Sequence, residues 1–238
     1  MYQHVHRCCG EVVGPVQGGA TQPVPEVQSG FSGPFADRVD AGRVLATRLS
    51  ALKEQDPVVV GLPRGGVVVA AEVARILQVP LEIVIVRKIG APSNPELALG
   101  AAGEGGVLVR NEELLNQVGL DRAAFQAAAD SATAQVEERS RLLRGDRPPP
   151  DVQGRMVIVV DDGIATGATA DAAIRVLKAR GAAKVVLAVP VATPDAIALL
   201  RRTADEVIVV DAPRRLGSVG AWYQDFSEVT DDQVLRLL

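Results

Sequence analysis

The sequence predicts an α/β fold in which a central, mainly parallel sheet is flanked by helices. Several short segments are apolar along their whole length, and they alternate with segments of helical periodicity. A strand without a polar face is typical of a parallel sheet that is covered on both sides. The expected strands are residues 58–62, 81–86, 156–160, 184–192 and 206–210.

Helical segments fill the intervals between these strands. Apolar residues recur at helical spacing in residues 36–54, which we expect to form an amphipathic helix. The sequence DRPPP at 146–150 breaks a long helical segment, because proline cannot continue a helix. A short strand is expected at 107–109. The further expected helices are residues 67–77, 111–145, 170–181, 194–202 and 230–238.

Composition excludes several classes of protein. The chain has 238 residues, which suits one α/β domain with a sizeable core. Because no apolar stretch approaches the roughly 20 residues of a membrane-spanning helix, we expect no membrane partner. The net charge is −4 and there is no Lys/Arg block, so we expect no nucleic-acid partner either.

The two cysteines and two histidines all lie within the first nine residues. The rest of the chain therefore has no Cys/His zinc site, no Ser-His-Asp triad and no thiol nucleophile. Their spacing fits no structural zinc pattern, and two cysteines give no disulfide framework, so we expect a cytoplasmic protein. Residues 1–34 are rich in Gly and Pro and lack the apolar core of a signal peptide. We expect them to form a flexible arm before one domain of residues 35–238.

The predicted topology limits where a ligand can bind. Ligands of parallel sheets bind beyond the carboxyl ends of the strands. Three loops lie there according to the predicted strands, at residues 61–66, 87–106 and 161–169.

The loop at 161–169 begins with two adjacent acids, Asp161 and Asp162, at the end of a buried strand. Its small residues allow backbone amides to converge on an anion at the start of a helix, and its threonines add hydroxyl donors. Carboxylates repel a phosphate, so the acids should face hydroxyl groups of the same ligand. A 5-phosphorylated ribose meets both demands. The candidate phosphate-binding residues are Gly163, Ile164, Ala165, Thr166, Gly167, Ala168 and Thr169.

The segment VIVVDDGIATGAT at 157–169 resembles the signature of the type I phosphoribosyltransferases. The segments LPRGG and RKIGAPSNPE resemble a group of small bacterial members, and the likeness covers about residues 35–230. The resemblance implies the fold of that family, with a small C-terminal or loop hood beside the site. It also implies Mg²⁺, phosphoribosyl diphosphate and a small nitrogenous base as ligands, and a homodimer. No separate protein metal site is implied, because the ligand holds most of the Mg²⁺ shell, with Asp161 or Asp162 reaching the ion through water.

The loop at 61–66 offers a second anion site. Gly65 and Gly66 permit a nest of backbone amides, and Arg64 adds a forked cation. The same residues also suit a tight turn with a surface arginine. In the family this loop binds diphosphate and often contains a cis peptide, which the sequence allows before either Pro63 or Arg64.

The loop at 87–106 begins with Arg87 and Lys88, and its glycines predict a mobile lid. Orotate and adenine enzymes of the family likewise have an Arg-Lys pair before a flexible loop, and a solvated strand end is the alternative explanation for the pair. Their loops carry further basic residues, whereas none lies between Lys88 and Arg110 here. That difference weakens stabilisation of the leaving group.

Three aromatic residues gather in the irregular tail at 211–229. By the resemblance, Trp222 and Tyr223 stack on the incoming base; alternatively they anchor the terminal helix in the core. Arg214 and Arg215 face an anionic substrate or solvent. The arginine-rich stretch at 137–147 is expected to be a solvated helix face.

The resemblance implies transfer of the phosphoribosyl group to a nitrogenous base with release of diphosphate. Asp161 and Asp162 would bind the ribose hydroxyls, while Arg64 and Lys88 would stabilise the departing diphosphate. Two alternatives remain open from the sequence: a regulator that binds the same ligand without turnover, and a hydrolase of a phosphorylated nucleoside.

Overall fold

The computed structural model describes residues 33–91 and 94–238. Its larger sheet has the strand order β2-β1-β6-β7-β8, and every neighbouring pair is parallel, as predicted. These strands are β1 (Val58–Gly61), β2 (Leu81–Ile83), β6 (Met156–Val160), β7 (Lys184–Val191) and β8 (Glu206–Asp211).

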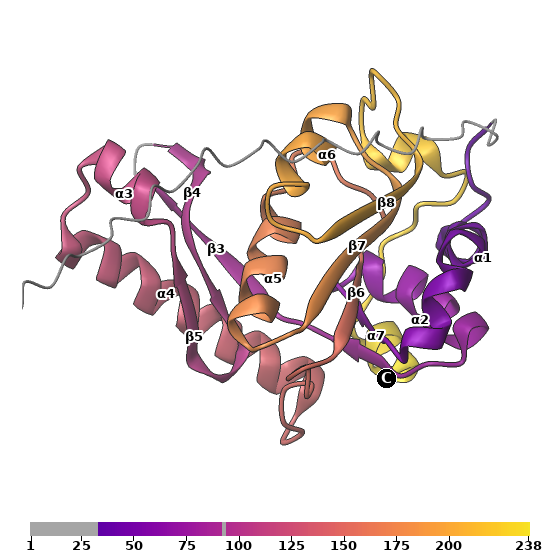
Figure 1. Ribbon diagram of the computed structural model, residues 1–238, viewed down its shortest axis with the longest axis horizontal. Helices are drawn as coiled ribbons and strands as arrows, with labels where there is room; N and C mark the ends of the chain where they lie inside the picture. Colours follow the sequence, from indigo (N-terminus) through magenta and orange to yellow (C-terminus); the bar gives the residue numbers. More distant parts are fainter. Residues whose placement is uncertain (1–32, 92–93) are drawn as a thin grey trace, which may run out of the picture.

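Helices cover both faces of this sheet (Figure 1). Val59 and Ile158 face α1 and α2, while their neighbours Val58 and Val157 face the side of α5 and α6. Because successive strand residues point to opposite faces, a continuous apolar run supplies both cores. The helices are α1 (Arg38–Leu49), α2 (Gly65–Leu77), α5 (Ala168–Ala179) and α6 (Pro194–Leu200).

A second, antiparallel sheet replaces the expected mobile lid at 87–106. It has the order β3-β4-β5, and the predicted strand at 107–109 is confirmed as its third member. The lid prediction was wrong because the segment is paired into strands, in which two of its glycines, Gly100 and Gly103, serve close packing. A Cβ on Gly100 would overlap the Val109 carbonyl, and one on Gly103 would overlap Val176 of α5. The strands are β3 (Val86–Ala91), β4 (Asn94–Gly103) and β5 (Val107–Arg110).

The small sheet lies between two helices. Its one face packs on α5 and the other on α4 (Arg122–Arg144), so α5 is shared by both sheets (Figure 1). The single helix predicted at 111–145 is in fact α3 (Glu112–Val118) followed by α4. Gly119 ends α3 with φ of 64°, and the Asp121 side chain caps α4.

Other predicted boundaries shift by a few residues. The helix expected at 36–54 continues beyond α1 as a 3₁₀ helix, Ser50–Gln55. The strand expected at 81–86 divides after Ile83, because the chain crosses there from one sheet to the other. Two further 3₁₀ turns are Glu104–Gly106 and Val219–Trp222, and the last helix is α7 (Asp231–Leu237). The expected arm falls almost wholly outside the described residues, as do its cysteines and histidines. No helix in the described parts of the chain is long and apolar enough to cross a membrane.

A buried ion pair ties the two sheets together at this crossing. Arg144 is 5% exposed, so it does not belong to the solvated face expected at 137–147. Its Nε donates to Glu104 over 2.8 Å, and its Nη2 donates to the Ile83 carbonyl over 2.7 Å. Glu104 also accepts the Ile85 amide over 3.0 Å. The pair therefore fixes the segment that leaves β2.

Candidate active site

Two loops separated in sequence meet at the carboxyl ends of β1 and β6. The strands are paired in parallel, with Gly61 beside Val160. A Cβ on Gly65 would overlap Oδ2 of Asp162. A Cβ on Gly66 would lie 2.8 Å from Cα of Asp161, closer than real Cβ contacts come. The two glycines therefore let the chain after β1 approach the acid pair.

Asp162 is held in place by several groups. Nε of Arg38 donates to its Oδ2 over 2.8 Å, and the Tyr223 hydroxyl donates to its carbonyl. The Asp162 amide donates to Oδ1 of Asp161 over 2.9 Å, so the two acids also orient each other. The Arg38 guanidinium lies 3.8 Å from the ring centroid of Phe226. Arg38 thus links α1, the acid pair and the C-terminal segment.

The environment of Asp161 disfavours its charged form. Burial raises the pKa of its carboxyl well above the usual value, and the negative charge of Asp162 raises this pKa further. The positive charge of Arg38 lowers it by a smaller amount. Burial also raises the pKa of the Tyr223 hydroxyl, which stays protonated as a donor. A positively charged group bound nearby would stabilise the ionised form of both acids.

The loop after the acids leads directly into α5. The Ile164 amide donates to the Val191 carbonyl over 2.9 Å, so this amide is not available to a ligand. Position 163 has room only for glycine, because a Cβ there would lie 3.0 Å from the Val191 side chain and 2.5 Å from the Val219 side chain. Gly167 has φ of 83° immediately before the helix, a conformation that favours glycine.

The end of this loop has the features of an anion site. The first amides of a helix have no partner within the helix, and α5 begins at Ala168. Ala165 and Thr166 are exposed beside it, and Thr169 is also exposed. The predicted phosphate loop therefore offers its later amides and both threonine hydroxyls, but not the Ile164 amide.

A cavity of about 540 Å³ adjoins the two loops. Three arginines line it, Arg64, Arg87 and Arg139, and its described lining includes no carboxylate. The peptide between Pro63 and Arg64 is cis, which settles the choice that the sequence left open. Lys88 follows Arg87 in β3, so its side chain points to the opposite face of the strand. The remaining lining residues are Leu62, Pro63, Val84, Ile85, Val86 and Thr169.

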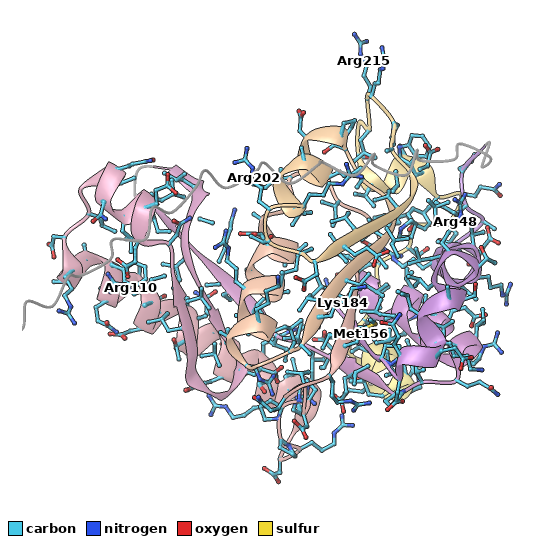
Figure 2. The ribbon with its side chains drawn as sticks, viewed as in Figure 1. Arg48, Arg110, Met156, Lys184, Arg202 and Arg215 are labelled. Atoms are coloured by element: carbon cyan, nitrogen blue, oxygen red, sulfur yellow. The ribbon has the colours of Figure 1, made fainter. Side chains whose placement is uncertain are left out.

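The aromatic residues of the tail are largely committed to packing. Tyr223 is 6% exposed, and its ring centroid lies 5.5 Å from that of Phe35 and 5.0 Å from that of Phe226. Trp222 is partly buried, and its Nε1 donates to the Leu216 carbonyl over 3.1 Å. Arg215 projects outward from the tip of its loop (Figure 2).

The sequence matches the phosphoribosyl transferase domain family over residues 37–220. The chain belongs to this family. It is 47% identical over 204 residues to a putative phosphoribosyl transferase of Mycobacterium tuberculosis, covering 86% of this chain and 46% of that protein. The chain therefore spans about half the length of the mycobacterial relatives that it matches. A uracil phosphoribosyltransferase of Clostridioides difficile is 42% identical over 74 residues, which cover 30% of this chain and 35% of that protein.

A crystal structure of a Thermus thermophilus protein has the same fold. Its TM-score is 0.79 at 46% identity, and the match covers 86% of this chain and 97% of that one. The parallel sheet with helices on both faces is therefore the type I phosphoribosyltransferase fold, as predicted.

Sequence reasoning missed three charged residues of this phosphoribosyltransferase-family site. Arg38 contacts an acid of the pair, Arg139 lines the cavity, and Glu228 pairs with Arg64. None of them lies in a recognisable motif. Arg139 belongs to the stretch that was expected to be a solvated helix face.

The family implies Mg²⁺, and the acid pair fits that ion in a limited way. In residues 33–91 and 94–238 no group of three or more His, Cys, Asp or Glu side chains could hold a metal. Mg²⁺ is usually held by one or two carboxylates together with waters and substrate phosphates. Asp161 and Asp162 supply two carboxylates whose mutual repulsion a cation would relieve. The residues thus suit an ion that arrives with a phosphorylated ligand.

Proposed function

We propose that the protein binds phosphoribosyl diphosphate with Mg²⁺ and transfers its phosphoribosyl group to a nitrogenous base, releasing diphosphate. One observation carries the proposal: Asp161 and Asp162 lie between the start of α5 and the Gly65-Gly66 turn. This arrangement offers acceptors for ribose hydroxyls between two places suited to anions.

Each part of the ligand has a place in this proposal. The amides at the start of α5, with Thr166 and Thr169, bind the 5-phosphate. Asp161 and Asp162 bind the 2- and 3-hydroxyls. Arg64, Arg87 and the amides of the glycine turn bind the diphosphate. Mg²⁺ would supply positive charge to the diphosphate oxygens. Lys88 points to the opposite face of β3 from Arg87, so this proposal gives it no contact with the diphosphate at the cavity.

The proposed reaction is a displacement at C1 of the ribose. The lone pair of a base nitrogen forms the new C–N bond, and the bond from C1 to the diphosphate oxygen breaks with its electron pair on the diphosphate. The proton of the attacking nitrogen passes to solvent. Positive charge develops on the ribose beside the two acids, so catalysis rests on positioning and electrostatics without a covalent nucleophile.

A regulator that binds the same ligand without turnover is the second candidate. Two observations favour it: no basic residue lies between Lys88 and Arg110, and Arg64 is already paired with Glu228. Both reduce the positive charge that is available to a departing diphosphate. The third possibility, a hydrolase, would prefer a nucleoside monophosphate to the diphosphate sugar.

A calorimetric titration with phosphoribosyl diphosphate, with and without Mg²⁺, tests the ligand. We expect metal-dependent binding, and its absence would overturn the proposal. A screen for diphosphate release with purine and pyrimidine bases then separates the candidates. Release with one base supports the transferase, whereas binding without release to any base supports the regulator. By the family likeness we also expect a homodimer in the cytoplasm, and sedimentation equilibrium measures the oligomeric state.

A further inference from the structure

The cavity that adjoins the two loops is lined by arginines from three separate elements. Arg64 follows β1, Arg87 lies in β3, and Arg139 lies in α4. We propose that Arg139 is a third arginine of the diphosphate site, and that Glu228 is the internal anion which the diphosphate replaces on Arg64. This inference deepens the proposed function and rests on it.

Arg139 is held so that its guanidinium stays at the cavity. Its Nη1 donates to Oδ2 of Asp231 over 2.8 Å, and its Nη2 donates to Oδ1, so the pair is bidentate. Asp231 begins α7, where the Thr230 capping box fixes the first turn. A fork held on one edge by a carboxylate keeps further N–H groups for a second anion.

The positive charges of Arg64 and Arg139 both act on Asp231. The pKa of Asp231 is lowered mainly by its hydrogen bonds to Arg139, and the positive charge of Arg64 lowers it further. Arg64 and Arg139 therefore act on the same region, although α4 is distant in sequence from the loop after β1. A diphosphate, with charge at two phosphorus centres, can contact several arginines at once.

Glu228 makes a contact that a ligand can readily displace. Its Oε1 lies 2.6 Å from Nη2 of Arg64, but the Glu228 side chain is 76% exposed. An exposed ion pair contributes little net free energy, because solvent screens it and two long side chains lose freedom. A diphosphate held by several charge-assisted contacts would therefore replace this single carboxylate on Arg64.

Titration of inorganic pyrophosphate into the full chain tests the role of Arg139. We expect Arg139→Gln to raise the Kd by roughly ten- to a hundredfold, the range for losing hydrogen bonds to a charged group. Arg141→Gln is the matched control, because Arg141 is exposed two positions along the same helix and points away from Arg139. Equal Kd values for the two variants would overturn the assignment of Arg139.

A merely structural role for Arg139 predicts a different pattern. If Arg139 acted only by docking α7 through Asp231, Asp231→Asn would weaken pyrophosphate binding as much as Arg139→Gln does. We expect Asp231→Asn to leave the Kd unchanged or lower it, because the asparagine oxygen still accepts a hydrogen bond from Arg139 while the competing negative charge is removed. Parallel losses in both variants would overturn direct binding by Arg139.

The role of Glu228 is tested by removing its charge. We expect Glu228→Gln to lower the Kd for pyrophosphate by roughly two- to fivefold, the equivalent of an exposed ion pair. Asp232→Asn is the control, because it removes one exposed negative charge from the same segment. The same Kd for both variants would overturn the displacement of Glu228.

The pyrophosphate titrations also separate this inference from the proposed function. Should pyrophosphate bind with the expected variant effects while phosphoribosyl diphosphate does not bind, the cavity assignment stands and the proposed function fails. If phosphoribosyl diphosphate binds equally to the wild type and to Arg139→Gln, the proposed ligand stands and the inference fails.

Discussion

Arg38 and Asp162, 124 residues apart in the sequence, form an ion pair with 2.8 Å between Nε and Oδ2. Their side chains are only 10% and 15% exposed, so the pair lies largely out of water. It connects the first helix of the fold to the acid pair that follows β6. The position of the acids thus depends on a residue far outside the signature segment.

Loss of the Arg38 guanidinium should destabilise the fold. We expect Arg38→Gln to lower the free energy of unfolding by about 3 kcal/mol, because Asp162 would remain partly buried beside Asp161 without its partner. Urea unfolding, followed by the fluorescence of Trp222, the single tryptophan, measures this.

Arg43→Gln provides the control for that substitution. Arg43 lies in the same helix and pairs with Glu72, but it is exposed, so we expect a loss below about 1 kcal/mol. Equal losses for the two variants would show that the Arg38 pair is not special.

The raised pKa of Asp161 predicts a dependence of stability on pH. The folded protein keeps the Asp161 proton to a higher pH than the unfolded chain does, so it binds more protons in the interval between the two pKa values. Stability contributed by this group therefore falls as pH rises through that interval and is constant above it. Asp161→Asn keeps an oxygen that can accept the Asp162 amide, but it does not titrate.

We accordingly expect Asp161→Asn to unfold at a higher temperature than the wild type at neutral pH. The difference should shrink as the pH falls toward the ordinary pKa of an aspartate. Melting temperatures of both proteins across this range provide the check, and subtraction removes the contributions of other carboxyls. A difference that does not change with pH would contradict the assignment.

The buried pair of Glu104 and Arg144 should contribute strongly to stability. We expect Glu104→Gln to cost about 3 kcal/mol, because it leaves the Arg144 charge inadequately paired in the interior. Glu112→Gln is the control, since Glu112 pairs with Arg110 at the surface and its loss should cost below about 1 kcal/mol. Chemical denaturation of both variants decides between a structural pair and an incidental contact.

The sequence predicted the parallel sheet because β1 and β6 are buried on both faces and therefore consist of apolar residues alone. The acid pair and the glycine turns were also predictable, since they follow these strands directly. The pairing of β3 with β4 was missed because β4 contains glycines and no β-branched or aromatic residue, a composition that disfavours a strand. Here those small residues let β5 and α5 approach, a tertiary requirement that no local pattern records.

Long-range charge pairs were hidden from the sequence for a related reason. Arg139 and Asp231 are 92 residues apart, and each lies in a segment of ordinary surface composition. Only the packing of α7 beside α4 brings them together. For Tyr223 the sequence left base stacking and packing as alternatives, and the fold packs its ring against Phe35 and directs its hydroxyl to Asp162.

Ligand binding should distinguish the two parts of the signature segment. We expect Asp162→Asn to weaken Mg²⁺-dependent binding of phosphoribosyl diphosphate by about 1–3 kcal/mol, the scale of a charged hydrogen bond. Thr169→Ala should cost less, because backbone amides at the start of α5 provide most of the proposed phosphate contacts. Calorimetric titration of both variants measures the order, with Thr47→Ala as the control, since Thr47 is exposed in α1 and donates to the Val44 carbonyl. An unchanged affinity in Asp162→Asn would contradict the assignment of this acid to the ribose hydroxyls, even if the phosphate loop binds as proposed.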